Sequence, residues 1–326
     1  MTEGGERTYE AIRSTAAWRL VRRDGVVVCG PGGLDWLQGQ VSQDLSSLAG
    51  KGEEGRHGSR ETLVLSPQGK IDSSCRVTTL GPDSYLLDVR SGFGGALYER
   101  LRRFKLRVKA DLELLDGLQS VEVRGPRAPS GRELASIGGT SLVAVVPVDW
   151  PSWTGSDVLF RGEVPAADLA LLDVGLDAGP GDDEAFEAAR IEAGVPELGL
   201  ELTERTIPQE AGELVARTVS FTKGCYTGQE LVARIDARGA NTPRSLRGVV
   251  IEGGKPTAGD AVLVAGAKVG ELTSVAWSPG FAGYVALAYI KRGTPTPSVA
   301  GVSTSGFTGA DEMTPASIGR LPLVSR

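Results

Sequence analysis

The sequence predicts a mixed α+β fold, with two interleaved sheet-and-helix lobes followed by a C-terminal β-barrel. Through most of the 326-residue chain, apolar runs of strand length alternate with short helical patterns. After Asn241-Thr242-Pro243 the helical patterns end, and short apolar runs alternate with Gly/Pro turns, which is typical of a small all-β domain. We therefore expect a core at residues 1–240, with lobes of roughly 1–115 and 116–240, and a barrel at residues 241–326.

The first lobe should begin with strands. Trp18–Gly30 carries apolar runs on both sides of Asp24-Gly25, a favoured turn dipeptide, so this segment predicts a β-hairpin. The apolar spacing over residues 34–41 predicts a short helix. Residues 46–60 are rich in Ser, Gly and charge, and therefore predict a solvated loop in which His57 is exposed.

Further strands and helices complete the core. Thr62–Val89 predicts a meander broken by Pro/Gly turns, and a helix follows over residues 97–104. Residues 117–177 carry more strands and turns. A helix is expected over Asp182–Ala193, capped by an aspartate at its start and stopped by Gly194. The barrel strands are expected at four apolar runs, namely Leu246–Ile251, Ala261–Val264, Glu271–Trp277 and Gly283–Ile290.

Composition limits the class of function. A net charge of −6 and a pI near 5.2 argue against a dedicated nucleic-acid binder, which usually carries a basic domain. The cysteines at positions 29, 75 and 225 are far apart and His57 is the single histidine, which disfavours a zinc site or a self-held iron–sulfur cluster. A sparse, odd cysteine set suits a reducing, cytoplasmic compartment. The polar residues 1–10 carry no signal core, and no apolar run is long enough for a membrane span.

The most informative segment is Lys223-Gly224-Cys225-Tyr226-Thr227-Gly228-Gln229-Glu230, just ahead of a predicted helix. Thr227 with Glu230 three residues later forms a capping-box pattern, so Thr227 is the expected N-cap. Cys225 would then lie near the free N–H groups and the positive end of the helix dipole, with Lys223 close by. Both effects favour the thiolate over the thiol and predict a reactive sulfur.

Other interpretations of Cys225 are open at this point. A free cysteine is often a small core hydrophobe, so Cys225 could equally be a structural residue in a tight turn. A Cys–His hydrolase needs a base beside the sulfur, and the single histidine is placed in a charged loop, which disfavours acyl transfer. A thiolate assisted by Lys223 would instead serve redox chemistry or ligand contact.

This signature, together with four other blocks in the same order, resembles the YgfZ-type folate-binding proteins. They are a branch of the superfamily that includes the glycine-cleavage T-protein, an aminomethyltransferase. The four other blocks are Leu37–Asp44, Ser66–Ile71, Arg190–Pro196 and Ile207–Glu210. The resemblance covers about residues 34–238 and implies a T-protein-like folate-binding core.

The resemblance also implies a function. A protein of this branch is expected to bind tetrahydrofolate or another reduced folate, and to support assembly or repair of iron–sulfur enzymes, including those that modify tRNA. The expected partners are therefore the folate and iron–sulfur enzymes or assembly factors, with tRNA as a further candidate and no membrane. One alternative is a folate-dependent one-carbon (aminomethyl) transferase. Another is an interaction module with a vestigial pocket.

One segment separates the two enzyme-like branches. Transferases of the superfamily carry Gly-Gly-x-Ile-Asp-Asp, whose acidic group acts near the reacting nitrogen. In this chain the corresponding segment is Gln68–Ser73, in which Asp72 remains and Ser73 replaces the second carboxylate. The transferase branch also lacks the cysteine-bearing signature. Both departures favour the YgfZ branch over a classical enzyme.

Polar residues inside the matched blocks are the candidates for the folate site, because a pterin edge needs hydrogen-bonding groups beside an apolar slot. The candidate folate contacts are Gln38, Gln40, Asp72, Glu192, Glu210, Tyr226, Gln229 and Arg234, and the candidate catalytic pair is Cys225 with Lys223. Each contact has a plainer alternative as a cap or surface residue. For Glu192 that alternative is a buried ion pair with Arg190 or Arg234.

A basic segment follows the second predicted helix. Arg100–Lys109 holds six basic residues in ten, and in its second half apolar and basic residues alternate. This alternation predicts a strand with one buried and one basic face. The plain interpretation of the basic face is a solvated surface. The functional interpretation is attraction of an anionic ligand, such as a polyglutamate tail or a tRNA phosphate.

Overall fold

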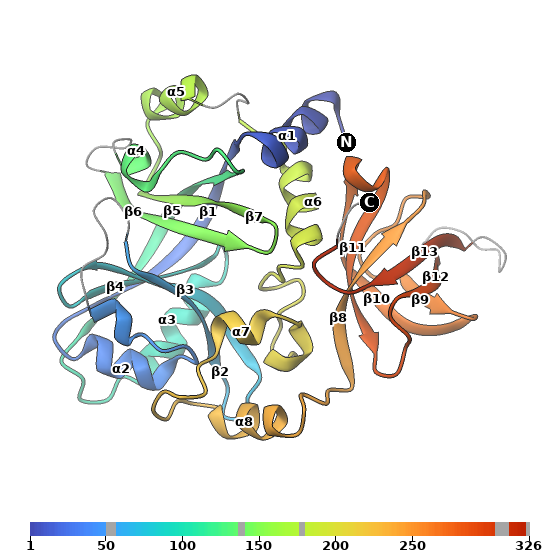
Figure 1. Cartoon of the computed structure of the whole chain (residues 1–326). Helices are drawn as coiled ribbons and strands as arrows, with labels where there is room; N and C mark the ends of the chain where they lie inside the picture. Colours follow the sequence, from blue (N-terminus) through green and yellow to red (C-terminus); the bar gives the residue numbers. More distant parts are fainter. Residues whose placement is uncertain (50–56, 136–140, 176–179, 304–312, 324–326) are drawn as a thin grey trace.

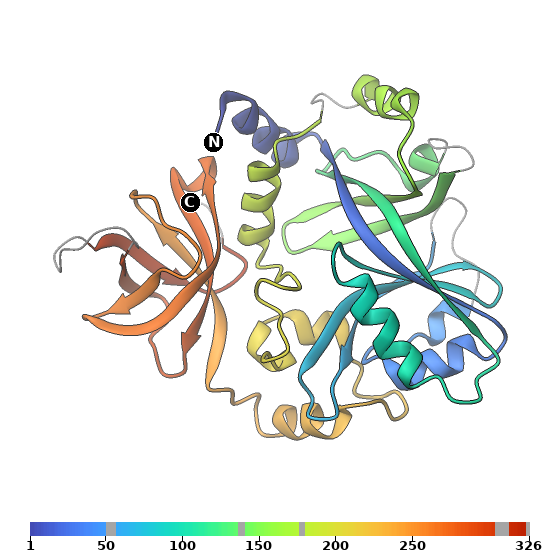
Figure 2. The same ribbon diagram turned by 180° about the vertical axis from the view of Figure 1, so that it is seen from behind.

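The computed structural model describes residues 1–49, 57–135, 141–175, 180–303 and 313–323. These residues form one large antiparallel sheet with helices packed on it, and a closed β-barrel beside it (Figure 1). Helix α6 lies between the sheet and the barrel in both views (Figure 2). The predicted fold class, a mixed α+β core with a C-terminal barrel, is confirmed. The domain limits given above stay predictions.

The sheet contains seven strands in the order β2-β3-β4-β1-β5-β7-β6, and every neighbouring pair is antiparallel. The strands are β1 (Ala17–Cys29), β2 (Ser59–Leu65), β3 (Ile71–Gly81), β4 (Ser84–Arg90), β5 (Asp111–Arg124), β6 (Leu142–Trp150) and β7 (Trp153–Arg161). The central strand β1 pairs with β4 on one side and β5 on the other. The two lobes therefore share one continuous sheet.

Strand β1 corrects the predicted hairpin. Ala17–Cys29 is one continuous strand, and the Asp24-Gly25 step lies at a bulge against β5 instead of forming a turn. A Cβ at Gly25 would lie 2.8 Å from Leu86 Cδ1, so packing against β4 favours glycine there. The hydrogen-bonding strands on both edges hold the segment extended, and the bulge absorbs the irregularity that the sequence presents as a turn signal.

Helices pack on the sheet through apolar side chains. Residues of α2, α3, α7 and α8 join one core cluster with β2, β3 and β4. The helices are α1 (Glu3–Ser14), α2 (Gly33–Gln40), α3 (Gly94–Arg103), α4 (Gly131–Ala135), α5 (Ala166–Gly175), α6 (Asp183–Ala193), α7 (Leu214–Thr218) and α8 (Gln229–Ala237), with short 3-10 turns η1 (Ser46–Ala49), η3 (Pro208–Ala211) and η4 (Pro279–Phe281). None of the helices in the described ranges combines the length and the apolar character needed to cross a membrane.

Helix α6 has the ends that the sequence predicts. The side chain of Asp182 accepts a hydrogen bond of 2.9 Å from the backbone N–H of Glu184, which makes Asp182 the N-cap. Gly194 terminates the helix in the left-handed conformation, with φ of 72°. Both signals are local to the chain, which is why they could be recognised without the fold.

Two local predictions are wrong. The strand expected at residues 104–109 is a loop after α3, in which Leu106 is 79% exposed and Arg107 has φ of 56°. A left-handed residue interrupts an extended strand, so the alternation of apolar and basic residues here marks a solvated loop. His57 is half-buried, since its Nδ1 accepts a hydrogen bond of 3.1 Å from the backbone N–H of Val145 in β6.

The C-terminal barrel is closed by six strands in the order β10-β11-β8-β13-β12-β9. They are β8 (Arg244–Ile251), β9 (Ala261–Val264), β10 (Ala267–Ser278), β11 (Gly283–Lys291), β12 (Ser298–Ser303) and β13 (Thr314–Gly319). Apolar side chains fill the interior. On the outside, residues of β10 and β11 share an apolar cluster with α1 and α6, which docks the barrel on the core.

Candidate functional site

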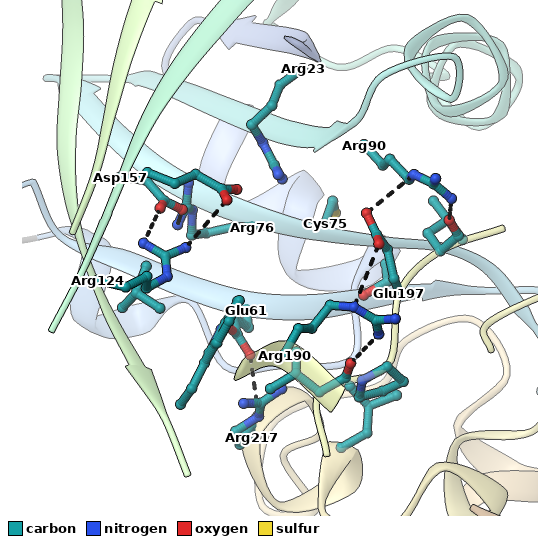
Figure 3. Close-up of a pocket in the computed structure, with 18 of the residues that line it drawn as sticks. Arg23, Glu61, Cys75, Arg76, Arg90, Arg124, Asp157, Arg190, Glu197 and Arg217 are labelled. Atoms are coloured by element: carbon teal, nitrogen blue, oxygen red, sulfur yellow. Dashed lines mark hydrogen bonds and ion pairs between the residues drawn. The ribbon is translucent and has the colours of Figure 1, made fainter. Parts of the chain in front are cut away.

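A cavity of about 160 Å³ lies within the core, between the sheet and the segments that contain α7 and the end of α6 (Figure 3). Both predicted lobes contribute to its wall. The wall is dominated by charge, because seven arginines and four carboxylates line it. The arginines are Arg19, Arg23, Arg76, Arg90, Arg124, Arg190 and Arg217, and the carboxylates are Glu61, Glu122, Asp157 and Glu197.

The strand register explains how the charges meet. Arg76 of β3 stands directly opposite Asp88 of β4, and Arg23 of β1 stands opposite Arg90 of β4. Directly opposed side chains in antiparallel strands are close enough to interact. The first pair joins opposite charges. The second brings two guanidinium groups to one part of the cavity wall, and each of them needs a carboxylate or a ligand nearby.

One wall of the cavity is a buried ion-pair network. Asp157 accepts from Arg76 Nη1 at 2.7 Å and lies 2.8 Å from Arg124 Nη1. Asp88 lies 2.9 Å from Arg76 Nε and 2.8 Å from Arg23 Nη2. Burial would raise the pKa of Asp157, but Arg124 and Arg76 outweigh it and hold the pKa below its usual value. Burial would likewise lower the pKa of Arg76, and its two carboxylate partners raise it instead.

The opposite wall has a second set of ion pairs. Arg190 lies 2.6 Å from Glu187 Oε1 and 3.2 Å from Glu201 Oε2, and these carboxylates raise its pKa although burial opposes them. Arg217, on α7, reaches Glu61 of β2 at the longer distance of 3.4 Å. The guanidinium groups are therefore held in place by carboxylates, Arg217 less tightly than Arg190.

Several donors at this site make no hydrogen bond within the described residues. They are the buried Arg124 Nε and Arg217 Nη1, and Arg217 Nε, whose contact with Glu61 is the ion pair of 3.4 Å. Arg124 also lies with its guanidinium carbon 4.6 Å from the centroid of the Trp150 ring. Arginine binds carboxylates and phosphates through paired N–H groups. An excess of arginine with unused donors can therefore hold an oxyanion.

Cys75 forms part of the cavity wall but is not suited to nucleophilic chemistry. Its side chain is buried in β3, and burial, with the negative charge of Asp88, raises the pKa of the thiol to about 12. A thiol with this pKa stays protonated near neutral pH. We therefore expect Cys75 to react slowly with thiol reagents. Cys29 is exposed at the end of β1, so burial does not protect it as it protects Cys75.

Lys223 of the signature is an anchor. Its ammonium donates hydrogen bonds of 2.8 Å to three backbone carbonyls at the end of α2, those of Gln38, Val41 and Gln43. It also lies 5.3 Å from the centroid of the buried Tyr226 ring. Burial lowers the pKa of Lys223 to about 8, with Asp44 acting in the opposite direction. Three carbonyl acceptors use all three N–H groups of the ammonium, so the charge is directed at α2 and not at Cys225.

Cys225 is exposed in the loop before α8. The helix begins later than predicted, because its N-cap is Gly228 in the left-handed conformation, with φ of 83° and no side-chain cap. Thr227 is therefore not the N-cap. A Cβ at Gly228 would lie 2.6 Å from the carbonyl oxygen of Ser66, so close packing on the neighbouring turn selects glycine at this position.

The other predicted residues of α8 lie at its solvent side. Glu230 forms an ion pair of 2.5 Å with Arg234, one turn later, and both side chains are more than half exposed. This pairing replaces the predicted capping box. Gln229 is the first residue of the helix. Tyr226 is buried just before it, and burial raises the pKa of its hydroxyl to about 12.

The predicted residues of the N-terminal blocks are dispersed. Gln38 Nε2 donates to Asp44 Oδ1 at 2.8 Å, which ties α2 to the following loop. Gln40 Oε1 is buried with no hydrogen bond among the described residues. Asp72 is ion-paired with Arg100 of α3 at 3.1 Å. None of these three side chains lines the central cavity.

Glu192 and Glu210 connect the core to the barrel. Glu192 Oε1 accepts hydrogen bonds from Tyr9 Oη at 2.8 Å and from Ser278 Oγ of β10 at 2.6 Å. Its partners are therefore neither of the two arginines that the sequence suggested. Burial raises the pKa of Glu192 although these hydrogen bonds act in the opposite direction. Glu210 lies 3.1 Å from Arg244, the first residue of β8.

The structure thus brings Gln38, Lys223 and Tyr226 together at the end of α2. All ten predicted site residues lie outside the lining of the central cavity. Their roles stay predictions. Sequence reasoning missed the arginines of the cavity. Their signal is an ionisable residue at alternate positions of an apolar strand, as in Glu122 and Arg124, which alternate with the buried Val121 and Val123. This signal becomes informative only once the strands are paired.

Comparison with known proteins agrees with this architecture. Residues 244–324 match the family model of the glycine cleavage T-protein C-terminal barrel domain. An aminomethyltransferase of Streptomyces avermitilis is 31% identical over 99% of this chain and 90% of its own length. The tRNA-modifying protein YgfZ of Edwardsiella ictaluri is 28% identical over 66% of this chain and 65% of its own length. The chain belongs to the YgfZ-type branch of the glycine-cleavage T-protein superfamily.

Two further comparisons describe this YgfZ-type protein. A mitochondrial iron-sulfur cluster assembly factor IBA57 homolog of Neurospora crassa is 28% identical over 70% of this chain and 52% of its own length. The crystal structure of glycine cleavage system aminomethyltransferase T from Bartonella henselae superposes with a TM-score of 0.74, covering 98% of this chain and 89% of that one. At 17% identity, this superposition shows a shared fold.

Proposed function

We propose that this protein is a tetrahydrofolate-binding accessory protein that supports iron–sulfur cluster assembly or repair, including in tRNA-modifying enzymes. The observation that carries the proposal is the charged central cavity, formed by both lobes of a T-protein-like core. Relatives named for tRNA modification and iron–sulfur cluster assembly support the second half of the proposal. A reduced folate is the proposed cofactor because folate use is expected across the superfamily.

Cys225 is proposed as the group that meets a partner. The signature loop presents it to solvent, and Lys223 holds that loop on α2 through three hydrogen bonds. An exposed thiol in an anchored loop suits contact with a client enzyme or an assembly factor better than chemistry inside the core. The thiol and the cavity would then serve two different steps, partner contact and folate binding.

A second candidate is a folate-dependent aminomethyltransferase, which is favoured by the full-length match to the Streptomyces avermitilis enzyme. Two observations weigh against it. The first carboxylate of the transferase segment, Asp72, is ion-paired with Arg100 and does not line the cavity. The second is replaced by Ser73. General acid–base catalysis contributes typically 10²–10⁴-fold, and this chain lacks the paired carboxylates for it.

Titration of the full-length protein with tetrahydrofolate tests the proposal. We expect saturable binding by calorimetry, and no methylene-tetrahydrofolate formation from an aminomethyl donor at roughly 1 s⁻¹, an ordinary enzyme rate. Turnover at that rate would replace the proposal with the transferase. Absence of binding by any reduced folate would leave a pure interaction module. In cells that lack the protein, the wild type should restore iron–sulfur enzyme activity and the Cys225→Ala variant should not.

A further inference from the structure

We propose that the central cavity is an oxyanion site, which receives the anionic end of the ligand: carboxylates such as those of a glutamyl tail, or a phosphate. Only the identification of the ligand as a folate depends on the proposed function. The cavity itself points to negative charge, since seven arginines and four carboxylates line it. Figure 3 shows the labelled arginines reaching the cavity from different segments of the chain. They are Arg23, Arg76, Arg90, Arg124, Arg190 and Arg217.

The carboxylates of the wall do not satisfy the arginines. Arg124 is 1% exposed, and its Nε makes no hydrogen bond. In Arg217, Nη1 is buried and makes no hydrogen bond, and Nε makes only the long ion-pair contact of 3.4 Å with Glu61 Oε2. A buried N–H group without an acceptor costs free energy, so a native site usually supplies one. An oxyanion of the ligand would supply acceptors to both side chains.

The remaining ion pairs prepare the site. Asp157 holds Arg76 and Arg124, and Asp88 holds Arg76 and Arg23. These guanidinium groups are therefore oriented before a ligand arrives, which reduces the entropy lost on binding. Charge-assisted hydrogen bonds to fixed guanidinium groups are among the strong polar interactions in proteins. The network thus acts as a support for the side chains that still have free donors.

The size and the lining of the cavity argue against burial of a whole folate. A volume of about 160 Å³ is below the roughly 300–1,000 Å³ of sites that enclose a drug-sized ligand. Trp150 is the aromatic residue of the lining, and the Arg124 guanidinium lies against its ring. A pterin would therefore find little free stacking surface, whereas a carboxylate or phosphate group needs neither the volume nor the stacking.

Binding measurements on the full-length protein test this inference. The ligands are tetrahydropteroate, which has no glutamyl tail, and the mono- and triglutamate of tetrahydrofolate. Inorganic phosphate is a separate probe, followed by the shift in melting temperature. The test variant is Arg217→Gln, which leaves only the half-exposed Glu61 without its partner. The matched control is Arg161→Gln, because Arg161 forms a surface pair of 3.3 Å with Glu113 outside the cavity.

We expect the glutamylated forms to bind the wild type and Arg161→Gln roughly tenfold to hundredfold more tightly than tetrahydropteroate, the range for one or two charge-assisted hydrogen bonds. Arg217→Gln should lose most of this difference. Phosphate should raise the melting temperature of the wild type and the control more than that of Arg217→Gln. A second variant, Arg23→Gln, gives the same comparison if Arg217→Gln does not fold, because Asp88 keeps Arg76 as its partner.

The outcomes separate this inference from the proposed function. Equal affinity for tetrahydropteroate and the glutamylated forms, with no effect of phosphate, would overturn the oxyanion site and leave folate binding intact. Phosphate protection that depends on Arg217, without binding of any reduced folate, would support the oxyanion site and reject folate as its ligand. A preference for the triglutamate without phosphate protection would assign the site to carboxylates. Failure of every ligand would overturn both proposals.

Discussion

Single charged residues replace apolar ones on the inner face of the strands around the cavity. Arg76 follows the buried Cys75 and precedes the buried Val77, yet its own side chain is also nearly buried. A buried ion is costly unless it is paired and hydrogen-bonded. Asp88 and Asp157 provide this pairing. Such pairs add little net stability, and their value in this protein is that they hold guanidinium groups in a defined geometry.

Glu192 shows the opposite balance, because burial outweighs its hydrogen bonds and raises its pKa from 4.5. The folded state then binds the proton more tightly than the unfolded state. The stability from the protonated form is present below pH 4.5 and is lost as the pH rises through the higher, folded pKa. We therefore expect the free energy of unfolding of Glu192→Gln to increase relative to that of the wild type as the pH rises from 4.5 to 7.5.

Urea unfolding at several pH values measures this difference. Glu6→Gln is a suitable control, because Glu6 is exposed on α1 and its substitution should give a difference that changes little with pH. The interpretation would be wrong if Glu192→Gln lost stability relative to the wild type as the pH rises. That result would mean that the ionised carboxylate is favoured by Tyr9, Ser278 and Arg13.

Cys225 should matter for function and not for stability. Its side chain is exposed, so Cys225→Ala is expected to change the free energy of unfolding by no more than about 0.5 kcal/mol. Competitive alkylation at neutral pH should modify Cys225 well before the buried Cys75, whose thiol pKa is raised to about 12. Cys29, which is also exposed, is the internal reference for exposure alone. Equal labelling of Cys225 and Cys75 would contradict the assignment.

In the signature segment, the side chain of Lys223 makes three of the hydrogen bonds that attach the segment to the end of α2 and the residues after it. Lys223→Met would remove the donor for the carbonyls of Gln38, Val41 and Gln43. We expect a loss of about 1–3 kcal/mol, the cost of leaving buried acceptors unpaired, and faster hydrogen exchange at residues 219–228. The control is Lys268→Met, which removes an exposed lysine paired with Glu271 in the barrel. Unchanged exchange in Lys223→Met would show that the loop is held by other contacts.

The sequence predicted correctly the features that depend on residues close together in the chain, and it failed for features that depend on contacts between distant segments. The ends of α6 depend on Asp182 and Gly194 alone, so they were recognised correctly. The continuity of β1 depends on β4 and β5, which are distant in sequence, and Asp24-Gly25 was therefore mistaken for a turn. The start of α8 depends on the packing of Gly228 against Ser66. A capping-box pattern cannot report that contact.

The same limit applied to the site. The signature could be recognised because it is a contiguous segment. The fold class followed from the signature and from the short apolar runs that alternate with Gly/Pro turns in the barrel. The cavity arginines lie on separate strands and helices, so each one looked like an isolated surface charge in the sequence. Arg100–Lys109, the densest basic segment, is instead a helix end and a loop, and none of its residues lines the cavity.

On the scale of the whole molecule, the core and the barrel are joined by a buried polar contact as well as by apolar packing. Glu201 Oε1 accepts hydrogen bonds from Ser274 Oγ at 2.6 Å and Thr273 Oγ1 at 2.7 Å, both in β10. Arg190 of α6 donates to Ser274 at 2.7 Å and pairs with Glu201 at 3.2 Å. Arg190 also lines the central cavity, so one side chain contacts both the candidate ligand site and the barrel.

Arg190→Met should therefore weaken the attachment of the barrel. The substitution leaves the fully buried Glu201 without its cation, and breaking a buried pair in this way costs about 3–5 kcal/mol. Hydrogen exchange should show barrel amides opening at lower free energy than core amides in the variant, because the lost contact joins the two parts. Arg7→Gln, which removes an exposed pair with Glu3, is the control and should leave exchange unchanged. If core and barrel amides of Arg190→Met remained equally protected, the apolar cluster of α1, α6, β10 and β11 would be sufficient to hold the barrel, and the polar contact would serve the cavity alone.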